Sequence, residues 1–313
     1  MNIFINNQEQ RLRAGWRLLV QFILMFLITG FFQLGIMLVW KSSLSLEQTI
    51  PLFIGILTSV WIAARFFDGR SLVDYGLEFD RRWEKEFLIG TGIGLFAMGA
   101  IFLVEWLAGW LTVSGFGWQE STNFGWKLAA AFVAMLMVGF HEELLSRGYQ
   151  ILNITEGLRY PQLGSRWPVI IAILATSLLF GCLHLANPNA SAVSTFNIVL
   201  AGIALAIPYA LTGSLAFSVG LHFSWNFMQG GICGFPVSGM KFQTSILRIS
   251  QAGTKLWTGG KFGPEAGLMG IMGIAIMILL SCVYIMATRG QLGIAERFKT
   301  DYQPKVKSDE HKL

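Results

Sequence analysis

Long apolar segments separated by short polar ones run along most of the chain. A helix of about 20 apolar residues crosses a bilayer. Because membrane helices satisfy their own backbone hydrogen bonds and can be apolar all round, the pattern predicts an all-α fold, a polytopic transmembrane helical bundle of about eight helices. We expect one integral-membrane domain over residues 1–297. Segments of spanning length lie near residues 18–40, 49–66, 87–110, 126–146, 168–187, 192–212, 214–233 and 265–287.

Composition supports a membrane protein. Hydrophobic residues make up 54% of the chain and charged residues 13%, whereas soluble domains have about 25% charged residues. The net charge of +5 is typical of basic residues at the cytoplasmic ends of spans, so nucleic acid is not an expected partner. The three cysteines, Cys182, Cys233 and Cys282, lie in or beside apolar segments. Their odd number and wide spacing resemble neither a disulfide framework nor a zinc site.

Basic residues cluster before the first span and after the second, fourth and eighth. By the positive-inside bias, both termini are cytoplasmic. One segment disagrees: residues 234–264 carry Lys241, Arg248, Lys255 and Lys261 although the count of spans puts them outside. This segment also contains "TGGKFGPEAG", which predicts irregular backbone that could fold back over the helix ends. The polar chain from Arg297 onward is expected to be disordered, with residues 298–313 as a cytoplasmic tail.

Charged residues occur directly behind an apolar span in "HEELLSR", residues 141 to 147. Ionisable groups in membrane segments are costly and usually face a polar cavity or one another. Adjacent glutamates project about 100° apart on a helix, so Glu142 and Glu143 cannot share one role with the same partner. Glu143 precedes Arg147 by four residues, the favourable order for an ion pair. Glu142 is then left to face elsewhere, unless both glutamates merely mark a solvated helix end.

Two further patterns place polar side chains in apolar segments. In "FGCLH", Phe180 and His184 are one helical turn apart, so the two rings can pack together. In "HFSWN", His222 and Asn226 point to one side of the seventh span. Each pattern alone is also explained by hydrogen bonding between helices. Together, a carboxylate, two imidazoles and a carboxamide include a general base and oxyanion donors, which suffice to activate water.

The three patterns together resemble the CPBP family of intramembrane proteases, which is related to the type II CAAX prenyl endopeptidase and to bacterial proteins that process bacteriocins or confer immunity to them. That family is marked by EExxxR, FxxxH and HxxxN or HxxxD, in this order on separate helices. Here they are Glu142-Glu143-x-x-x-Arg147, Phe180-x-x-x-His184 and His222-x-x-x-Asn226. The resemblance covers about residues 126–230, and His141 is not part of it.

The resemblance implies an endopeptidase that hydrolyses a peptide bond in or near the membrane. Glu142 and His184 would activate water, His222 and Asn226 would stabilise the oxyanion, and Glu143, Arg147 and Phe180 would support them. "HEELL" is not the zinc motif HExxH, because Leu145 stands where the second histidine would be. Glu142, His184 and His222 could still form a three-ligand zinc site. Both glutamate-dependent and metal-dependent descriptions are open, and we favour the metal-free one.

The depth of the two water-activating residues is a difficulty. With simple antiparallel spans that start at Trp126 and Trp167, Glu142 and His184 would lie near opposite faces of the membrane. They can share a water if the fourth helix continues past Gln150, if the fifth is displaced or broken near "ANPN", or if one boundary differs from the one predicted. Extending the fourth helix to about Thr155 is the least disruptive repair, because "GYQILNIT" contains no proline. Without such a repair, the enzyme hypothesis fails.

The alternative is a non-catalytic membrane protein that keeps the fold for partner binding or bacteriocin immunity. A histidine-ligated haem or ion-conducting bundle is a third hypothesis, which leaves EExxxR unexplained. We expect a peptide or protein substrate that could be lipidated, a bilayer environment, and a location in the plasma membrane of a prokaryote. No cofactor other than zinc is indicated.

Overall fold

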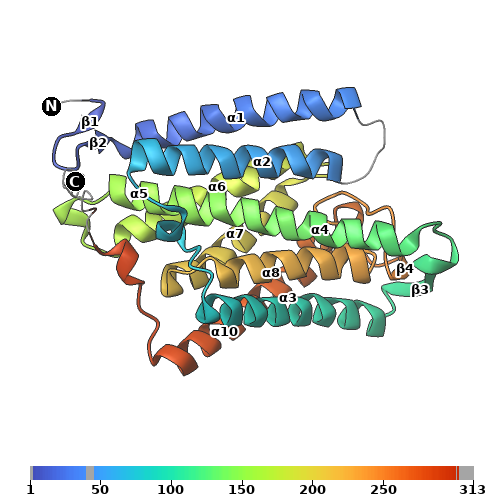
Figure 1. Ribbon diagram of the computed structural model, residues 1–313. Coiled ribbons are helices and arrows are strands. Elements are labelled where there is room, and N and C mark those ends of the chain that lie inside the picture. Colours follow the sequence, from blue (N-terminus) through green and yellow to red (C-terminus); the bar gives the residue numbers. More distant parts are fainter. Residues whose placement is uncertain (1–2, 40–45, 301, 303–313) are drawn as a thin grey trace.

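The computed structural model describes residues 3–39, 46–300 and 302. Long helices run roughly parallel to one axis and form a bundle (Figure 1). Seven helices in this part of the chain are long and apolar enough to cross a membrane, so the predicted fold class, a polytopic helical bundle, is confirmed. The helices are α1 (Ala14–Val39), α2 (Leu46–Ala63), α3 (Arg81–Leu107), α4 (Phe124–Glu143), α5 (Leu152–Gly157), α6 (Trp167–Leu183), α7 (Ala192–Thr212), α8 (Ala216–Asn226), α9 (Lys255–Thr258) and α10 (Leu268–Arg289).

The seventh predicted span is shorter than the others. Helix α8 has 11 residues, and the π-helical segment η7 (Phe227–Ile232) continues it by 6. Every residue of α8 is buried, and the helix lies between α3 and α4 in the middle of the bundle (Figure 1). A helix surrounded by protein has no lipid-facing length to match, so it does not need the full thickness of the bilayer.

Small residues allow α3 and α8 to pack closely. A Cβ atom at Gly90 of α3 would lie 2.3 Å from the carbonyl oxygen of Phe217. Glycine on one helix therefore lets the backbone of the other approach, as at many helix contacts in membranes.

We expect Gly90→Ala to lower the free energy of unfolding by about 1–3 kcal/mol, because the added methyl overlaps the α8 backbone. Gly92→Ala is the matched control, since no atom lies within 4 Å of its Cβ position. Alanine there should be neutral or slightly stabilising. Thermal unfolding in detergent would compare the two, and equal melting temperatures would contradict the contact.

Helix α4 does not end at the charged motif. It continues through the π-helical segment η4 (Leu144–Ile151) into α5, so that one helical rod extends over residues 124–157. The C-terminal end of this rod packs beside the start of α6. Glu142 and His184 therefore lie at similar distances from the same end of the bundle. The extension proposed from the sequence is present and removes the depth difficulty.

The hairpin before α1 and the described chain after α10 lie at one end of the bundle, and most of the segment between α8 and α10 lies at the other (Figure 1). At that far end, β3 (Leu111–Phe116) pairs antiparallel with β4 (Leu247–Gln251). The glycine-rich chain then forms the short 3-10 helix η9 (Pro264–Ala266), which packs on α7 and α10. The irregular backbone expected for this segment is thus observed. A smaller hairpin, β1 (Ile5–Asn6) with β2 (Arg11–Leu12), lies near the N-terminus.

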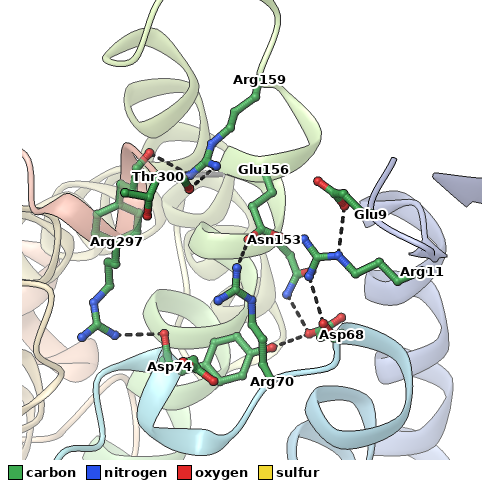
Figure 2. A network of polar contacts seen from close by, with 12 residues as sticks. Glu9, Arg11, Asp68, Arg70, Asp74, Asn153, Glu156, Arg159, Arg297 and Thr300 are labelled. Carbon is green, nitrogen blue, oxygen red and sulfur yellow. Dashed lines mark hydrogen bonds and ion pairs between the residues drawn. The ribbon is translucent and has the colours of Figure 1, made fainter. Parts of the chain in front are cut away.

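Buried ion pairs hold the terminal end of the bundle together (Figure 2). The Glu156 carboxylate accepts hydrogen bonds from Arg11 at 2.8 Å and from Arg17 at 3.1 Å, and it also pairs with Arg70. Arg17 also bonds Asp68 at 3.3 Å. Arg17 is therefore a buried partner of two carboxylates as well as a basic residue ahead of the first span.

The chain after α10 packs back on this end. Phe298, in the 3-10 turn η10 (Glu296–Phe298), is 1% exposed and contacts the ring of Tyr209. The Arg297 guanidinium bonds Glu78 at 2.7 Å and the carbonyl of Asp74 at 2.9 Å. The expected disorder from Arg297 onward is therefore wrong for residues 297–300. The rest of the predicted tail, residues 301 and 303–313, lies outside the described residues.

Candidate active site

Three elements bring the motif residues together. Glu142 and Glu143 end α4, and Arg147 follows in η4. Phe180 lies near the end of α6, and His184 begins the 3-10 turn η6 (His184–Ala186) directly after it. His222 and Asn226 lie one turn apart on the buried helix α8. Residues up to 84 positions apart in the chain thus meet in the middle of the bundle.

Glu143 is the buried centre of a three-residue contact. Its Oε1 accepts a hydrogen bond from Nη1 of Arg147 at 3.0 Å and lies 2.8 Å from Nδ1 of His222. The i,i+4 ion pair expected from the sequence is present. Because a carboxylate only accepts hydrogen bonds, Nδ1 of His222 carries a proton and donates it. The other ring nitrogen, Nε2, is left to face Glu142.

Arg147 is held from two further sides. Its Nη2 donates to the carbonyl of Gly202 on α7 at 3.1 Å. Its guanidinium carbon lies 4.5 Å from the centre of the Phe180 ring. The centre of the same Phe180 ring lies 4.7 Å from the centre of the His184 imidazole. Phe180 therefore contacts both Arg147 and His184.

Glu142 and Glu143 face different nitrogens of the same imidazole, His222. Oε2 of Glu142 lies 3.7 Å from Nε2 of His222, which is too long for a hydrogen bond. The same oxygen is buried and has no hydrogen-bond partner in the described part of the protein. This carboxylate oxygen is therefore free to bind a water or a substrate group.

His184 has its tautomer set by the backbone. Its Nδ1 lies 2.7 Å from the carbonyl oxygen of Phe180. Since a carbonyl accepts, Nδ1 is the donor, and the lone pair of the neutral ring is on Nε2. His184 thus offers a basic nitrogen at the end of α6.

A cavity of about 460 Å³ connects these groups. Glu142, His184, His222 and Asn226 all line it. Apolar side chains of α1, α2 and α4 form another part of its wall, including Met25, Leu52, Ile56, Met135 and Val138. The site is thus a small polar patch in a largely apolar cavity, as is typical of ligand sites.

The cavity is also lined by polar residues outside the three motifs, among them His141, Asn197 and Glu265. His141 is 1% exposed, and neither ring nitrogen has a hydrogen-bond partner among the described residues. Asn197 lies on α7 and Glu265 in η9. Burial raises the pKa of the Glu265 carboxyl. For Glu265, the signal in the sequence is a lone glutamate inside the glycine-rich segment "GPEAG". That this glutamate reaches the cavity depends on tertiary packing.

The candidate zinc set of Glu142, His184 and His222 shares one cavity. Within the described ranges, no three His, Cys, Asp or Glu side chains gather closely enough to hold a metal ion. The Nδ1 atoms of His184 and His222 are already bonded to Phe180 and Glu143. The Nε2 atoms of both rings face the cavity side of the site, where they can bind water or a substrate group.

Comparison with known proteins gives one finding. Residues 124–228 match the family model described as "type II CAAX prenyl endopeptidase Rce1-like". This segment, from α4 to the start of η7, contains every motif residue. No curated protein and no solved structure matches the chain. The match supports an integral membrane protease of the CAAX endopeptidase kind, with a peptide or protein substrate. The family resemblance of the three motifs is therefore confirmed over residues 124–228, which match the Rce1-like model, consistent with the CPBP family.

Proposed function

We propose that this protein is an intramembrane endopeptidase in which Glu142 and His184 activate a water and His222 and Asn226 stabilise the oxyanion. The observation that carries the proposal is that these four side chains, from three separate elements, line one cavity. Peptide hydrolysis needs a base for the water and hydrogen-bond donors for the oxygen of the scissile carbonyl. The four residues include both kinds of group.

Water activation uses the two basic atoms that the protein leaves free. Glu142 Oε2 has no partner in the described residues, and Nε2 of His184 carries a lone pair because Nδ1 donates to Phe180. A water held between a carboxylate and an imidazole can lose a proton to the carboxylate as it attacks the carbonyl carbon. The protonated carboxyl can then return this proton to the leaving amine.

Oxyanion stabilisation uses donors on α8. The Glu143 carboxylate beside Nδ1 of His222 favours the imidazolium form, in which Nε2 also carries a proton. Nε2 of His222 and the Asn226 amide, one helical turn away, can then both donate to the developing negative charge. Glu143 and Arg147 act through His222 and are positioning residues.

The surroundings of the site fit a substrate that is itself in the membrane. The cavity wall formed by α1, α2 and α4 is mostly apolar, so an apolar peptide segment or a lipid attached to a peptide can enter without losing contact with apolar groups. We also propose that both termini are cytoplasmic, because basic residues cluster before the first span and after the last one. The membrane is proposed to be the plasma membrane of a prokaryote.

Cleavage of fluorogenic peptides by the protein in nanodiscs tests the function. The panel contains apolar peptides with and without a prenyl group, assayed with and without a strong chelator. We expect cleavage that the chelator does not change. Loss of cleavage on chelation, restored by zinc, would replace the metal-free mechanism with a metal-dependent one. Cleavage that persists when Glu142 is replaced would contradict the assignment of the base.

A further inference from the structure

The cavity has an uneven charge distribution. Two carboxyls line it, Glu142 on α4 and Glu265 in η9. None of the described residues that line it is Lys or Arg, and its basic side chains are the three imidazoles of His141, His184 and His222. The proposed mechanism uses Glu142 but not Glu265. The second carboxyl therefore needs its own explanation.

Glu265 is held in place by neutral groups alone. The backbone N–H of Ser238 donates to its Oε2 at 2.6 Å, and the Ser238 hydroxyl lies 3.2 Å from Oε2 and 3.3 Å from Oε1. The Gln229 side chain contributes a further hydrogen bond. Glu265 is 7% exposed and forms no ion pair with any described residue. A buried carboxylate without a cation is costly, and a proton or a cationic ligand would compensate the charge that the hydrogen bonds from Ser238 leave.

A second acceptor lies in the same part of the cavity. Asn197 is 1% exposed, and its Nδ2 donates to the carbonyl of Gly267, two residues after Glu265. Its Oδ1 is buried without a hydrogen-bond partner among the described residues, and the residue lines the cavity. A free acceptor in the same cavity as a carboxyl without an ion pair favours a ligand that donates several hydrogen bonds and carries positive charge.

The segment that carries Glu265 is fixed to the catalytic turn. The Asn187 amide, which follows η6, donates to the carbonyl of Ser238 at 3.1 Å. Asn187, Ser238 and Glu265 all line the cavity, and the His184 imidazole lies within electrostatic range of the Glu265 carboxyl. The Glu265 carboxyl and Asn197 therefore line the same cavity as the water-activating residues, where a bound substrate can contact them.

We propose that Glu265 and Asn197 form a subsite for a cationic group of the substrate, the ammonium or guanidinium of a basic side chain near the scissile bond. This inference rests on the proposed function only in that the bound peptide is a substrate; binding of the cationic group does not depend on it. Such a cation supplies a counter-charge for Glu265, since none of the described lining residues is Lys or Arg, and it donates the hydrogen bonds that Glu265 and Asn197 Oδ1 can accept. Burial raises the pKa of Glu265, so a bound cation would also favour its ionised form. An acidic side chain at the same position would be rejected.

Peptide binding to the Glu142→Gln protein in nanodiscs tests the subsite without any need for cleavage. The probes are fluorescent 15-residue Leu/Ala peptides that carry one Lys, norleucine or Glu, moved stepwise along the sequence. At one position, the Lys peptide should bind at least about tenfold more tightly than the norleucine peptide, and the Glu peptide should bind more weakly than both. When Glu265→Gln is combined with Glu142→Gln, the Lys and norleucine peptides should bind about equally tightly.

Two further variants control the result. Glu120→Gln makes the same chemical change at an exposed position outside the cavity and should keep the Lys preference. Glu265→Asp keeps the charge and should retain most of it, even if glutamine disturbs the packing of η9. A Lys preference that survives Glu265→Gln, or no preference at any position, would overturn the subsite. A clear preference without cleavage by the wild type would instead contradict the proposed function and leave the subsite in place.

Discussion

Replacing Glu142 by glutamine is expected to lower kcat/KM for peptide cleavage by about 10³-fold, the middle of the range for a general base. Glutamine has nearly the same shape but cannot accept a proton from water at neutral pH. Among the described residues, the nearest ion-pair partner of Glu142 is His222 at 3.7 Å, so the folded protein should tolerate the change. Cleavage rates and thermal unfolding of the same preparations would be measured together.

The loss should fall on kcat more than on KM, because proton transfer is a property of the transition state rather than of the bound substrate. Glu120→Gln, on the exposed loop after β3, is the matched control and should cleave at the wild-type rate. An equal loss in both variants would indicate a preparation effect. If Glu142→Gln kept the wild-type kcat, Glu142 could not be the base, and the hypothesis of a non-catalytic or differently organised site would gain support.

The sequence was sufficient for the features that depend on local spacing. Apolar length predicted the spanning helices, and the i,i+4 spacing of Glu143 and Arg147 predicted their ion pair. The spacing of Phe180 and His184 likewise predicted the packing of their rings. These contacts lie within one helix or its next turn, where the 3.6-residue period determines which side chains are neighbours.

Contacts between segments that are distant in the chain could not be predicted from helical spacing. Helix spacing indicated that Glu143 pairs with Arg147 but not that the same oxygen also binds His222, which comes from α8. Likewise, Glu265 reaches the cavity only because the chain between α8 and α10 folds back over the end of α6. Such contacts follow from the packing of several helices, and one sequence contains no periodic signal for them.

The length of α8 is a related case. Its apolar character predicted a spanning segment, because hydropathy alone does not distinguish a lipid-facing helix from one enclosed by protein. The buried helix is shorter and carries His222 and Asn226 among its 11 residues. Polar groups are tolerated there because neighbouring helices shield them from lipid and supply partners such as Glu143.

Replacing Arg147 by methionine is expected to lower the free energy of unfolding by about 3–5 kcal/mol. Arg147 is 1% exposed and Glu143 is fully buried, so the substitution leaves a carboxylate in the protein interior without its main counter-charge. The loss of the 3.1 Å bond to Gly202 and of the contact with Phe180 adds to the effect. Denaturant titration of the protein in mixed micelles would measure it.

The double variant Glu143→Met with Arg147→Met separates stability from positioning. Removing both charges eliminates the unpaired carboxylate, so the double variant should recover much of the stability lost in the single one. Its activity should nevertheless stay low, because His222 loses the carboxylate that holds Nδ1 at 2.8 Å and favours the imidazolium. Recovery of both stability and cleavage would show that Glu143 serves only as the partner of Arg147. Recovery of stability alone would identify the buried pair as the support that keeps His222 oriented toward the substrate carbonyl.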